Sequence, residues 1–498
     1  MTDLGVGAWP ARSARIRPEA VAFRQGERSV RYAEAARRVD ALAAGLAGLG
    51  VRKGDRVAYL APNDIATFEA FFAATRLGAL FVPLNTRLAP PEIGYLLADC
   101  GARVLLHDPA VTEIGGVEAA LAVGADLEAL IESAAGTTPP DTEVGLADDA
   151  LILYTSGTTG RPKGAVLTHA NLTFNTMNQL AHVDVLSSDV VLCTAPLFHA
   201  TGLGQVSLPA IFKGGTVVLA PRFDPAWTLG TIARLGINAF SAVPTMLQLL
   251  CDAPEFAATD LSSLRYVIYG GSPILERVAR AWLDRGVPLL QGYGMTEASP
   301  GVLMAASGEA PRRPLSPGVP HFFTDVALRD ASGAIGPAQG TGELLVRGPN
   351  VFRGYWNRPA DTEASFTDGW FRSGDVLRAD DDGWFSVVDR VKDMIISGGE
   401  NIYPSEVEAA IAEYPEVVDC AVIGVADERW GEAGLAYLVL RPGRELPEAT
   451  LRRRLADRLA AYKIPKYVRF TDDLPRTATG KIRKADLRAM ASDLEENR

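Results

Sequence analysis

One stretch of the chain combines glycines, hydroxyls and a lysine at a spacing that suits phosphate chemistry. Residues 153–169 read LYTSGTTGRPKGAVLTH, with apolar runs at 151–153 and 165–167 on either side of the polar part. Glycines let backbone N–H groups turn toward an anion, the hydroxyls add donors, and Lys163 supplies a point charge. The glycine spacing differs from that of a Walker A loop. On these residues alone, a flexible surface linker remains the alternative.

A tyrosine between two glycines, followed by a glutamate, forms a second candidate in residues 291–297, QGYGMTE. The glycines beside Tyr293 let a purine base approach the ring, where base–aromatic stacking is worth roughly 1–3 kcal/mol. Glu297 can hold Mg²⁺, which takes one or two carboxylates together with phosphate oxygens. Taken singly, a core aromatic and a solvated acid are the alternatives for these two residues.

Two further stretches carry an aspartate and a lysine. Asp375 follows a glycine turn in GWFRSGD, where its carboxylate can accept hydrogen bonds from both vicinal hydroxyls of a ribose, and Arg390 can add a donor to the same sugar. Lys481 lies in RTATGKI, and a lone lysine in a basic tail is normally exposed to solvent. Each residue alone fits an ordinary surface role, so these residues gain meaning only from occurring together.

Composition bounds the class of protein. The 498 residues are 48% hydrophobic and 22% charged, which is typical of a globular chain with two or more domains. The net charge of −11 argues against nucleic-acid binding. No C-x-x-C pair occurs among Cys100, Cys193, Cys251 and Cys420, so we expect reduced thiols and a cytoplasmic location. We find no signal peptide and no run near the ~20 residues of a spanning helix, so no integral membrane contact is expected.

The hydrophobic spacing predicts the elements that position these residues. A helix is expected at 31–50, where apolar residues recur three and four apart. The order of a strand at 56–60, a helix at 67–77 and a strand at 79–84 predicts parallel, doubly wound sheets. Later strands are expected at 190–192, 216–219 and 266–269. Two more, at 324–328 and 343–346, are predicted to be antiparallel and to form a small β-barrel.

The composition changes near residues 389–393, DRVKD, and a block of about a hundred residues follows. Strands are expected at 417–425 and 435–440, and leucines spaced four apart predict a helix around 451–459. We therefore predict an α/β protein with an N-terminal domain, residues 1–391, and a smaller α+β domain, residues 392–498. The predicted boundary between them is Lys392.

Taken in order along the chain, the motifs YTSGTTGRPKG, APLFH, GGSP, QGYGMTE, GWFRSGD, DRVKDMIISGGENIYP and PRTATGKI resemble the acyl-adenylate-forming, or AMP-binding, superfamily. The resemblance covers nearly the whole chain. It implies ATP, Mg²⁺ and coenzyme A as cofactor and substrates. The implied reaction joins a carboxylic acid to ATP, giving acyl-AMP and pyrophosphate, and then transfers the acyl group to coenzyme A with release of AMP.

The resemblance also implies a role for each matching residue. The phosphate-gripping loop would be formed by Thr155, Ser156, Gly157, Thr158, Thr159, Gly160 and Lys163. The adenine would be flanked by Gly270, Gly271, Ser272, Pro273, Gly292 and Tyr293. Thr296 would contact the α-phosphate, Glu297 would bind Mg²⁺, and Asp375 and Arg390 would hold the ribose. Lys481 would bridge the substrate carboxylate and the α-phosphate during adenylation.

The same resemblance places the acyl pocket and the second half-reaction. The acyl pocket would be lined by Phe198, His199, Thr201, Tyr269, Gly294, Pro300 and Gly301. His199 would line the passage for the acyl and pantetheine groups, and its alternative is a satisfied core histidine. Rotation about Lys392 would withdraw Lys481 and bring in a thiolation loop made of Ser397, Gly398, Gly399, Glu400 and Asn401.

The segment SGGENIYP resembles the acyl-CoA synthetase branch, which favours coenzyme A as the acceptor thiol. Overall the chain is most similar to bacterial feruloyl- and hydroxycinnamoyl-CoA synthetases, so we predict ferulate or another hydroxycinnamate as the acid. A medium- or long-chain fatty acid is the alternative. A non-catalytic nucleotide-binding protein, the third possibility, would lack Lys481, Glu297 or Asp375, and all three are present. The sequence leaves the oligomeric state open, with a homodimer as one alternative.

Overall fold

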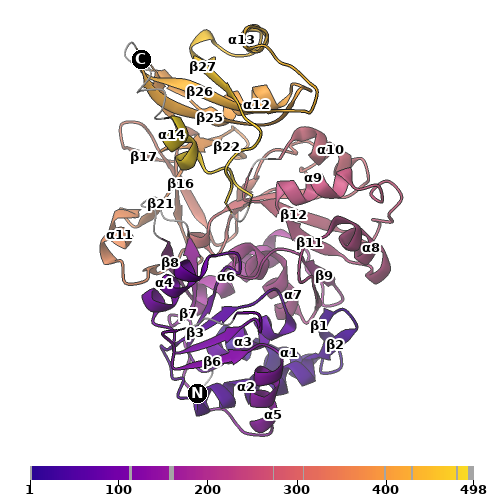
Figure 1. Cartoon of the computed structure of the whole chain (residues 1–498). Coiled ribbons are helices and arrows are strands. Elements are labelled where there is room, and N and C mark those ends of the chain that lie inside the picture. Colours follow the sequence, from indigo (N-terminus) through magenta and orange to yellow (C-terminus); the bar gives the residue numbers. More distant parts are fainter. Residues whose placement is uncertain are drawn as a thin grey trace. The chain divides into compact units, whose positions relative to one another are not determined.

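The computed structural model describes residues 3–111, 115–155, 162–272, 274–306, 308–397, 400–427, 430–477 and 480–491 (Figure 1). Of Arg390, Glu400 and Asn401 it describes the backbone. The chain divides into two compact units. The first comprises Met1–Val326 and Val346–Arg372, and the second comprises Ala327–Leu345 and Ser373–Arg498.

A nine-stranded sheet forms one layer of the first unit, in the order β15-β14-β13-β12-β11-β9-β10-β1-β2. Its strands are β1 (Val21–Gln25), β2 (Arg28–Arg31), β9 (Val190–Cys193), β10 (Thr216–Leu219), β11 (Ala239–Ala242), β12 (Tyr266–Gly270), β13 (Leu289–Gly294), β14 (Gly301–Met304) and β15 (Val319–Pro320). The central pairs from β1 to β13 are parallel, whereas β2, β14 and β15 pair antiparallel at the edges. The strands predicted at 190–192, 216–219 and 266–269 are thus present.

A seven-stranded sheet follows the order β19-β8-β7-β4-β3-β5-β6. Its strands are β3 (Arg56–Leu60), β4 (Leu80–Pro83), β5 (Val104–His107), β6 (Ala119–Ala122), β7 (Asp149–Thr155), β8 (Lys163–Thr168) and β19 (Gly354–Tyr355). The pairs from β6 to β7 are parallel, and β7, β8 and β19 pair antiparallel. Parallel strands joined by helices confirm the predicted α/β class.

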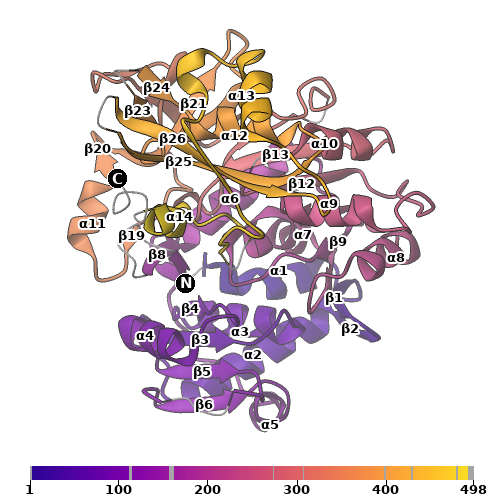
Figure 2. The same ribbon diagram turned by 45° about the horizontal axis from the view of Figure 1, so that its top comes forward.

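Helices connect and cover these two sheets. They are α1 (Trp9–Ile16), α2 (Tyr32–Gly48), α3 (Ile65–Arg76), α4 (Pro90–Cys100), α5 (Ala125–Ser133), α6 (His169–His182), α7 (Leu208–Lys213), α8 (Pro225–Leu235), α9 (Pro244–Asp252), α10 (Glu276–Leu283) and α11 (Pro359–Ala364), with short turns η1 (Val6–Ala8), η2 (Gly202–Ser207) and η3 (Thr296–Ala298). Figure 2 shows α2 packed beside α3 and α5. Leu229, Leu247 and Trp282, from α8, α9 and α10, bury against one face of the nine-stranded sheet.

Local chemistry explains where these helices begin. The Asp64 side chain accepts a hydrogen bond from the Ala66 amide at 2.8 Å and so caps α3, and such a cap is worth about 1 kcal/mol. Thr168 caps α6 in the same way through the Asn171 amide. The predicted helix at 31–50 is α2, and the predicted strand–helix–strand at 56–84 is β3, α3 and β4.

The chain passes between the two units within a six-stranded sheet of order β17-β16-β18-β21-β20, with β22 beside β21. Its strands are β16 (Asp325–Arg329), β17 (Ile335–Gly336), β18 (Gly340–Arg347), β20 (Phe366–Thr367), β21 (Trp370–Ala379) and β22 (Phe385–Arg390). The strands predicted at 324–328 and 343–346 are β16 and β18. The hinge predicted at Lys392 lies beyond this sheet and stays a prediction.

The second unit contains a five-stranded sheet whose two faces are both covered. Its strands are β23 (Ile395–Ser397), β24 (Glu400–Ile402), β25 (Val417–Asp427), β26 (Gly431–Leu440) and β27 (Tyr467–Phe470), and its helices are α12 (Pro404–Ala412), α13 (Glu448–Ala456), η4 (Ala461–Lys463) and α14 (Lys484–Ala491) (Figure 1). Val422 packs with α12 and α13, whereas its neighbour Ile423 packs with α14. Successive side chains of a strand point to opposite faces, so a nearly continuous apolar run is expected here.

Candidate active site

The predicted phosphate loop joins β7 to β8. Thr155 ends β7 and lies opposite Lys163, which begins β8, and the Thr155 hydroxyl donates to the Lys163 carbonyl at 3.4 Å. A Cβ on the next residue, Gly164, would lie 2.7 Å from Ile152, so only glycine fits this packed position. The remaining loop residues lie outside the described part of the chain: Ser156, Gly157, Thr158, Thr159 and Gly160.

Lys163 contacts two residues that were not predicted. Its ammonium lies 2.9 Å from an Asp361 carboxylate oxygen on α11 and 5.4 Å from the centre of the Tyr355 ring. The Lys163 side chain is 16% exposed and that of Asp361 is 38% exposed. The lysine charge is therefore neutralised by a carboxylate that solvent can reach.

Tyr355 also contacts the predicted metal ligand. Its hydroxyl donates to Glu297 Oε1 at 2.8 Å, and the amide of Phe352 donates to the Glu297 carbonyl, also at 2.8 Å. The structure thereby brings Lys163 and Glu297 to the same tyrosine, although they are far apart in the sequence. No local signal marks Tyr355, because β19 is only two residues long.

The base of the hairpin is anchored through Asp99 of α4. The Tyr154 hydroxyl donates to the Asp99 carboxylate at 2.8 Å, and Arg358 donates to the same carboxylate at 3.2 Å. The Trp356 indole donates to the Asp99 carbonyl at 3.2 Å. Burial raises the pKa of Tyr154 far above its usual range, so the phenol stays a hydrogen-bond donor.

The predicted adenine-flanking residues meet at the carboxyl ends of two parallel strands. Gly270 of β12 lies opposite Gly292 of β13. A Cβ on Gly270 would lie 2.6 Å from the Gly292 carbonyl oxygen, and Gly271 has a φ of +90°, so this turn requires glycine. Tyr293 follows, half-buried, and Ser272 is exposed, while Pro273 lies outside the described residues. Ligands of doubly wound sheets bind at such strand ends.

The predicted acyl-pocket residues come together around the loop after β13. A Cβ on Gly294 would lie 1.7 Å from the Pro300 carbonyl oxygen, and one on Gly204, in η2, would lie 2.7 Å from Pro300 Cδ. Asn175 of α6 accepts from the Gly301 amide at 3.1 Å and donates to the Gly204 carbonyl at 3.0 Å. Small residues thus let two backbone segments approach closely here.

Four of the predicted pocket residues lie on neighbouring elements. The rings of Phe198 and His199 are 4.7 Å apart, and Thr201 precedes η2. The buried Tyr269 hydroxyl has one proton to donate, and it lies 2.8 Å from the Pro314 carbonyl oxygen and 3.0 Å from Gln291 Oε1. The Tyr269 ring is fully buried in the core on one face of the nine-stranded sheet.

The predicted ribose pair lies in the second unit. Asp375 of β21 is the cross-strand partner of Arg390 in β22, and Gly374, with a φ of +71°, precedes it within β21. The Gly374 carbonyl accepts from the Val391 amide at 2.9 Å. Residues that are directly opposite in an antiparallel pair are close enough to contact one sugar together.

The remaining predicted residues of the second unit occupy exposed or turn positions. Lys392 is exposed and is followed by Asp393, which pairs with Arg488 at 2.7 Å. Lys481 is exposed, and its amide donates to the Thr477 hydroxyl at 3.1 Å. The thiolation-loop residues Ser397, Glu400 and Asn401 belong to the hairpin β23–β24, and Gly398 and Gly399 lie outside the described residues.

The donor set fits magnesium better than a protein-caged metal. Among the described residues no group of three or more His, Cys, Asp or Glu side chains converges on one point. Glu297 stands in the site as a carboxylate oriented by a tyrosine. Mg²⁺ characteristically takes few protein ligands and completes its shell with phosphate oxygens and water.

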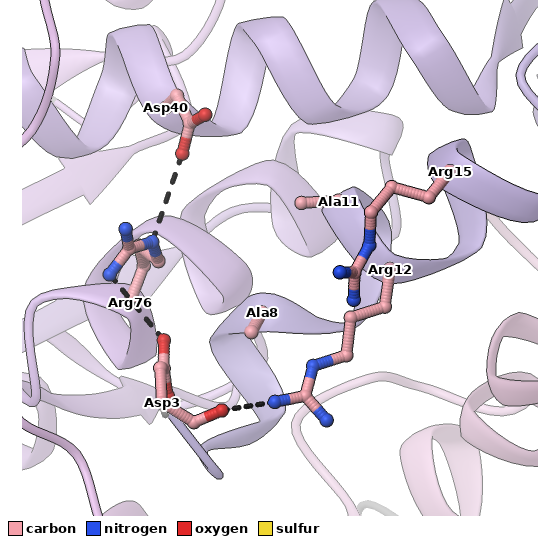
Figure 3. Close-up of a pocket in the computed structure, with 7 residues that line it drawn as sticks. All are labelled: Asp3, Ala8, Ala11, Arg12, Arg15, Asp40 and Arg76. Carbon is pink, nitrogen blue, oxygen red and sulfur yellow. Dashed lines mark hydrogen bonds and ion pairs between the residues drawn. The ribbon is translucent and has the colours of Figure 1, made fainter. Parts of the chain in front are cut away.

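A surface pocket lies away from all these residues. It has a volume of about 450 Å³ and is lined by Asp3, Ala8, Ala11, Arg12, Arg15, Asp40 and Arg76 (Figure 3). Arg76 lies between the carboxylates of Asp3, at 3.4 Å, and Asp40, at 3.8 Å. Because no predicted site residue lines the pocket, we do not assign the nucleotide to it. In the described part of the chain no helix is long and apolar enough to span a bilayer.

The chain is similar to known proteins along nearly its whole length. The AMP-binding enzyme profile matches residues 10–356, and the profile of the AMP-binding enzyme C-terminal domain matches residues 406–481. A feruloyl-CoA synthase from Amycolatopsis sp is 51% identical over 98% of this chain and 99% of its own length.

Two solved structures are similar along nearly their whole length. A fatty acyl CoA synthetase from Mycobacterium tuberculosis superposes with a TM-score of 0.80 at 35% identity, covering 99% of both chains. An o-succinylbenzoate CoA synthetase from Bacillus subtilis, solved with its acyl-adenylate intermediate, gives a TM-score of 0.86 at 33% identity, covering 96% of this chain and 97% of its own. With the profile matched over most of its length, the chain belongs to the AMP-binding enzyme family.

Proposed function

We propose that this protein is an ATP-dependent acid–CoA ligase whose acid is ferulate or another hydroxycinnamate. The acid and ATP give acyl-AMP and pyrophosphate, and acyl-AMP and coenzyme A then give acyl-CoA and AMP. The observation that carries the substrate is the 51% identity to a feruloyl-CoA synthase over 98% of the chain. The meeting of Lys163 and Glu297 at Tyr355 supports the adenylation chemistry.

The first half-reaction requires charge to be screened. A carboxylate must attack an α-phosphate that is itself anionic, so positive groups and N–H donors have to surround the reacting oxygens. We assign Lys163 and Thr155 to the polyphosphate, Thr296 to the α-phosphate, and Lys481 to the bridge between the carboxylate and that phosphate. Mg²⁺ bound at Glu297 would neutralise phosphate charge and orient the leaving pyrophosphate.

The nucleotide is held at its other end by groups from separate elements. Gly270, Gly271 and Tyr293 would flank the adenine, because they lie at or next to the carboxyl ends of β12 and β13, where ligands of doubly wound sheets bind. Asp375 and Arg390 would hold the ribose hydroxyls.

The second half-reaction needs different neighbours for the same acyl group. We propose that the C-terminal domain turns about Lys392, which takes Lys481 away and brings the β23–β24 hairpin, with Ser397 and Glu400, to the acyl-AMP. His199 would line the passage through which the thiol of coenzyme A reaches the acyl carbon. The thiol displaces AMP, so the bond to sulfur forms as the acyl–phosphate bond breaks.

The residue types of the predicted acyl pocket bear on which acid is used. The small residues Gly294, Pro300 and Gly301 and the aromatic Phe198 suit either a flat aromatic ring or an alkyl chain. A medium- or long-chain fatty acid is the second candidate, supported by the 35% identity to a fatty acyl CoA synthetase. We keep the hydroxycinnamate as the preferred acid because the feruloyl-CoA synthase is considerably more similar.

Pyrophosphate release with ATP and Mg²⁺ tests this function. The acids are ferulate, coumarate, octanoate and palmitate, each with and without coenzyme A. We expect release with the two hydroxycinnamates and acyl-CoA formation only when coenzyme A is present. Pyrophosphate release with the fatty acids but not with the hydroxycinnamates would overturn the preferred substrate.

A cytoplasmic location and a homodimer also stay predictions. Sedimentation of the purified protein checks whether it is a homodimer.

A further inference from the structure

Tyr355 is the side chain at which two groups assigned to the metal–nucleotide site meet. Its hydroxyl donates to Glu297 Oε1 at 2.8 Å. The Lys163 ammonium lies 5.4 Å from the centre of its ring, within the distance at which a cation is attracted to an aromatic face. One phenol thus contacts both the predicted metal ligand and the predicted phosphate-binding lysine.

The backbone fixes the place of this phenol. Tyr355 lies opposite Ala165 in the antiparallel pair of β19 and β8, so it is tied to the strand that begins with Lys163. Its amide donates to the Thr362 hydroxyl at 2.9 Å. The Phe352 ring packs edge-on against it at 4.9 Å, and the Phe352 amide holds the Glu297 carbonyl. Lys163, through strand β8, and Glu297, through the Phe352 amide, are therefore both linked to the short segment that contains Phe352 and Tyr355.

The geometry of the phenol suits a donor role. A tyrosine hydroxyl has one proton to donate, and in this structure that proton is directed at the Glu297 carboxylate. A partner that fixes one oxygen of a ligating carboxylate orients the group for a metal.

Resting on the function proposed above, we propose that Tyr355 is a positioning residue of the metal–nucleotide site. Through its hydroxyl, Tyr355 holds the Glu297 carboxylate in the orientation that receives Mg²⁺. Through its ring it holds the Lys163 ammonium beside the polyphosphate. Tyr355 touches neither the acid nor the reacting phosphorus, so its effect passes through these two side chains.

The variant Tyr355→Phe separates positioning from packing, since it removes the hydroxyl and keeps the ring. The probe is Mn²⁺ as a substitute for Mg²⁺, with its binding followed by electron paramagnetic resonance in the presence of α,β-methylene-ATP, which cannot be adenylated. Loss of a partner that orients a metal ligand typically weakens metal binding 10–100-fold, so we expect about a 10-fold loss for this single hydroxyl. Nucleotide binding without metal should be nearly unchanged.

Tyr95→Phe is the matched control. It removes another half-buried phenol hydroxyl of the first unit, one that accepts from Arg358 at 3.1 Å, and it should leave Mn²⁺ binding at the wild-type value. A second comparison guards against general damage. In a Glu297→Gln background, Tyr355→Phe should cause little further loss, because interacting residues are not additive.

Equal Mn²⁺ affinity in the wild type and Tyr355→Phe would overturn the inference, as would a full additional loss in the Glu297→Gln background. Neither result would contradict the proposed function, which is tested by pyrophosphate release that requires an acid. Conversely, a wild type that binds Mn²⁺ and nucleotide but activates no acid would overturn the proposed function. The comparison between the two tyrosine variants would still decide the role of Tyr355.

Discussion

Lys163 forms an ion pair with Asp361. We therefore predict that this protein binds ATP more weakly than it would if Asp361 carried no charge. The lysine ammonium lies 2.9 Å from the carboxylate. A polyphosphate that takes Lys163 as a partner has to replace Asp361, which then returns to solvent. Removing the carboxylate charge with Asp361→Asn should therefore strengthen ATP binding.

The expected size follows from exposure. Asp361 is 38% exposed, so water screens the pair and its worth is discounted to that of a surface ion pair, about 0.5–1 kcal/mol. Since 1.4 kcal/mol is tenfold in an equilibrium constant, Asp361→Asn should lower the dissociation constant of ATP about 2–5-fold. The difference should shrink as salt is raised, because the Debye length falls from about 10 Å at 0.1 M to about 3 Å at 1 M.

Calorimetric titration with α,β-methylene-ATP at two salt concentrations measures this effect. Glu363→Gln is the control, because it removes one negative charge from an exposed position of the same helix, α11. It should change affinity much less than Asp361→Asn. Weaker nucleotide binding by Asp361→Asn would refute the reasoning, since it would mean that Asp361 orients Lys163 for the phosphate instead of competing with it.

Three further predictions concern other parts of the molecule. Lys481→Ala should nearly abolish pyrophosphate release yet spare thioester formation from supplied acyl-AMP, and equal loss of both half-reactions in single-turnover assays would contradict the assignment. Gly270→Ala should lower the free energy of unfolding by about 1–3 kcal/mol, because its methyl group would lie 2.6 Å from the Gly292 carbonyl, and an unchanged urea midpoint would count against it. Burial lowers the pKa of His321 to about 3, so between that value and about 6.5 the unfolded chain binds a proton that the native state excludes. Stability should therefore fall as pH drops from 7 to 5, and a His321→Gln protein with an equally steep fall would exclude this histidine as a cause.

The order of secondary structure could be predicted because its signals are local. Apolar runs and turns marked β3, α3 and β4, and Asp64 caps the helix between them within the span of a few residues. The full extent of β25, Val417–Asp427, was harder to predict. Its last residues gain their partners from β26 across the hairpin, and such pairing depends on tertiary structure.

The candidate site could be predicted only where its residues fall in a motif. The motifs supplied Gly270 and Gly292, and the parallel register of β12 and β13 places them opposite each other. Tyr355 and Asp361 lie outside those motifs, and their contacts with Lys163 arise from the pairing of β19 with β8 and from the position of α11. No spacing along the chain encodes such a contact.

The division into compact units also depends on tertiary structure. The change in composition near residues 389–393 marks a place where the chain could turn, and Lys392 remains our predicted hinge. The compact division instead assigns Ala327–Leu345 to the second unit, and β17, β16 and β18 belong to one sheet with β21, a strand that is later in the chain. Strand neighbours that are distant in sequence cannot be read from composition.

The most direct test of the central claim is to identify the products formed from ATP, Mg²⁺ and ferulate before and after coenzyme A is added. In the absence of coenzyme A, mass spectrometry should detect feruloyl-AMP and pyrophosphate. On addition of coenzyme A, the adenylate should disappear as feruloyl-CoA and AMP form in equal amounts. Formation of ADP and phosphate, or no acyl-adenylate with any acid tested, would contradict the account.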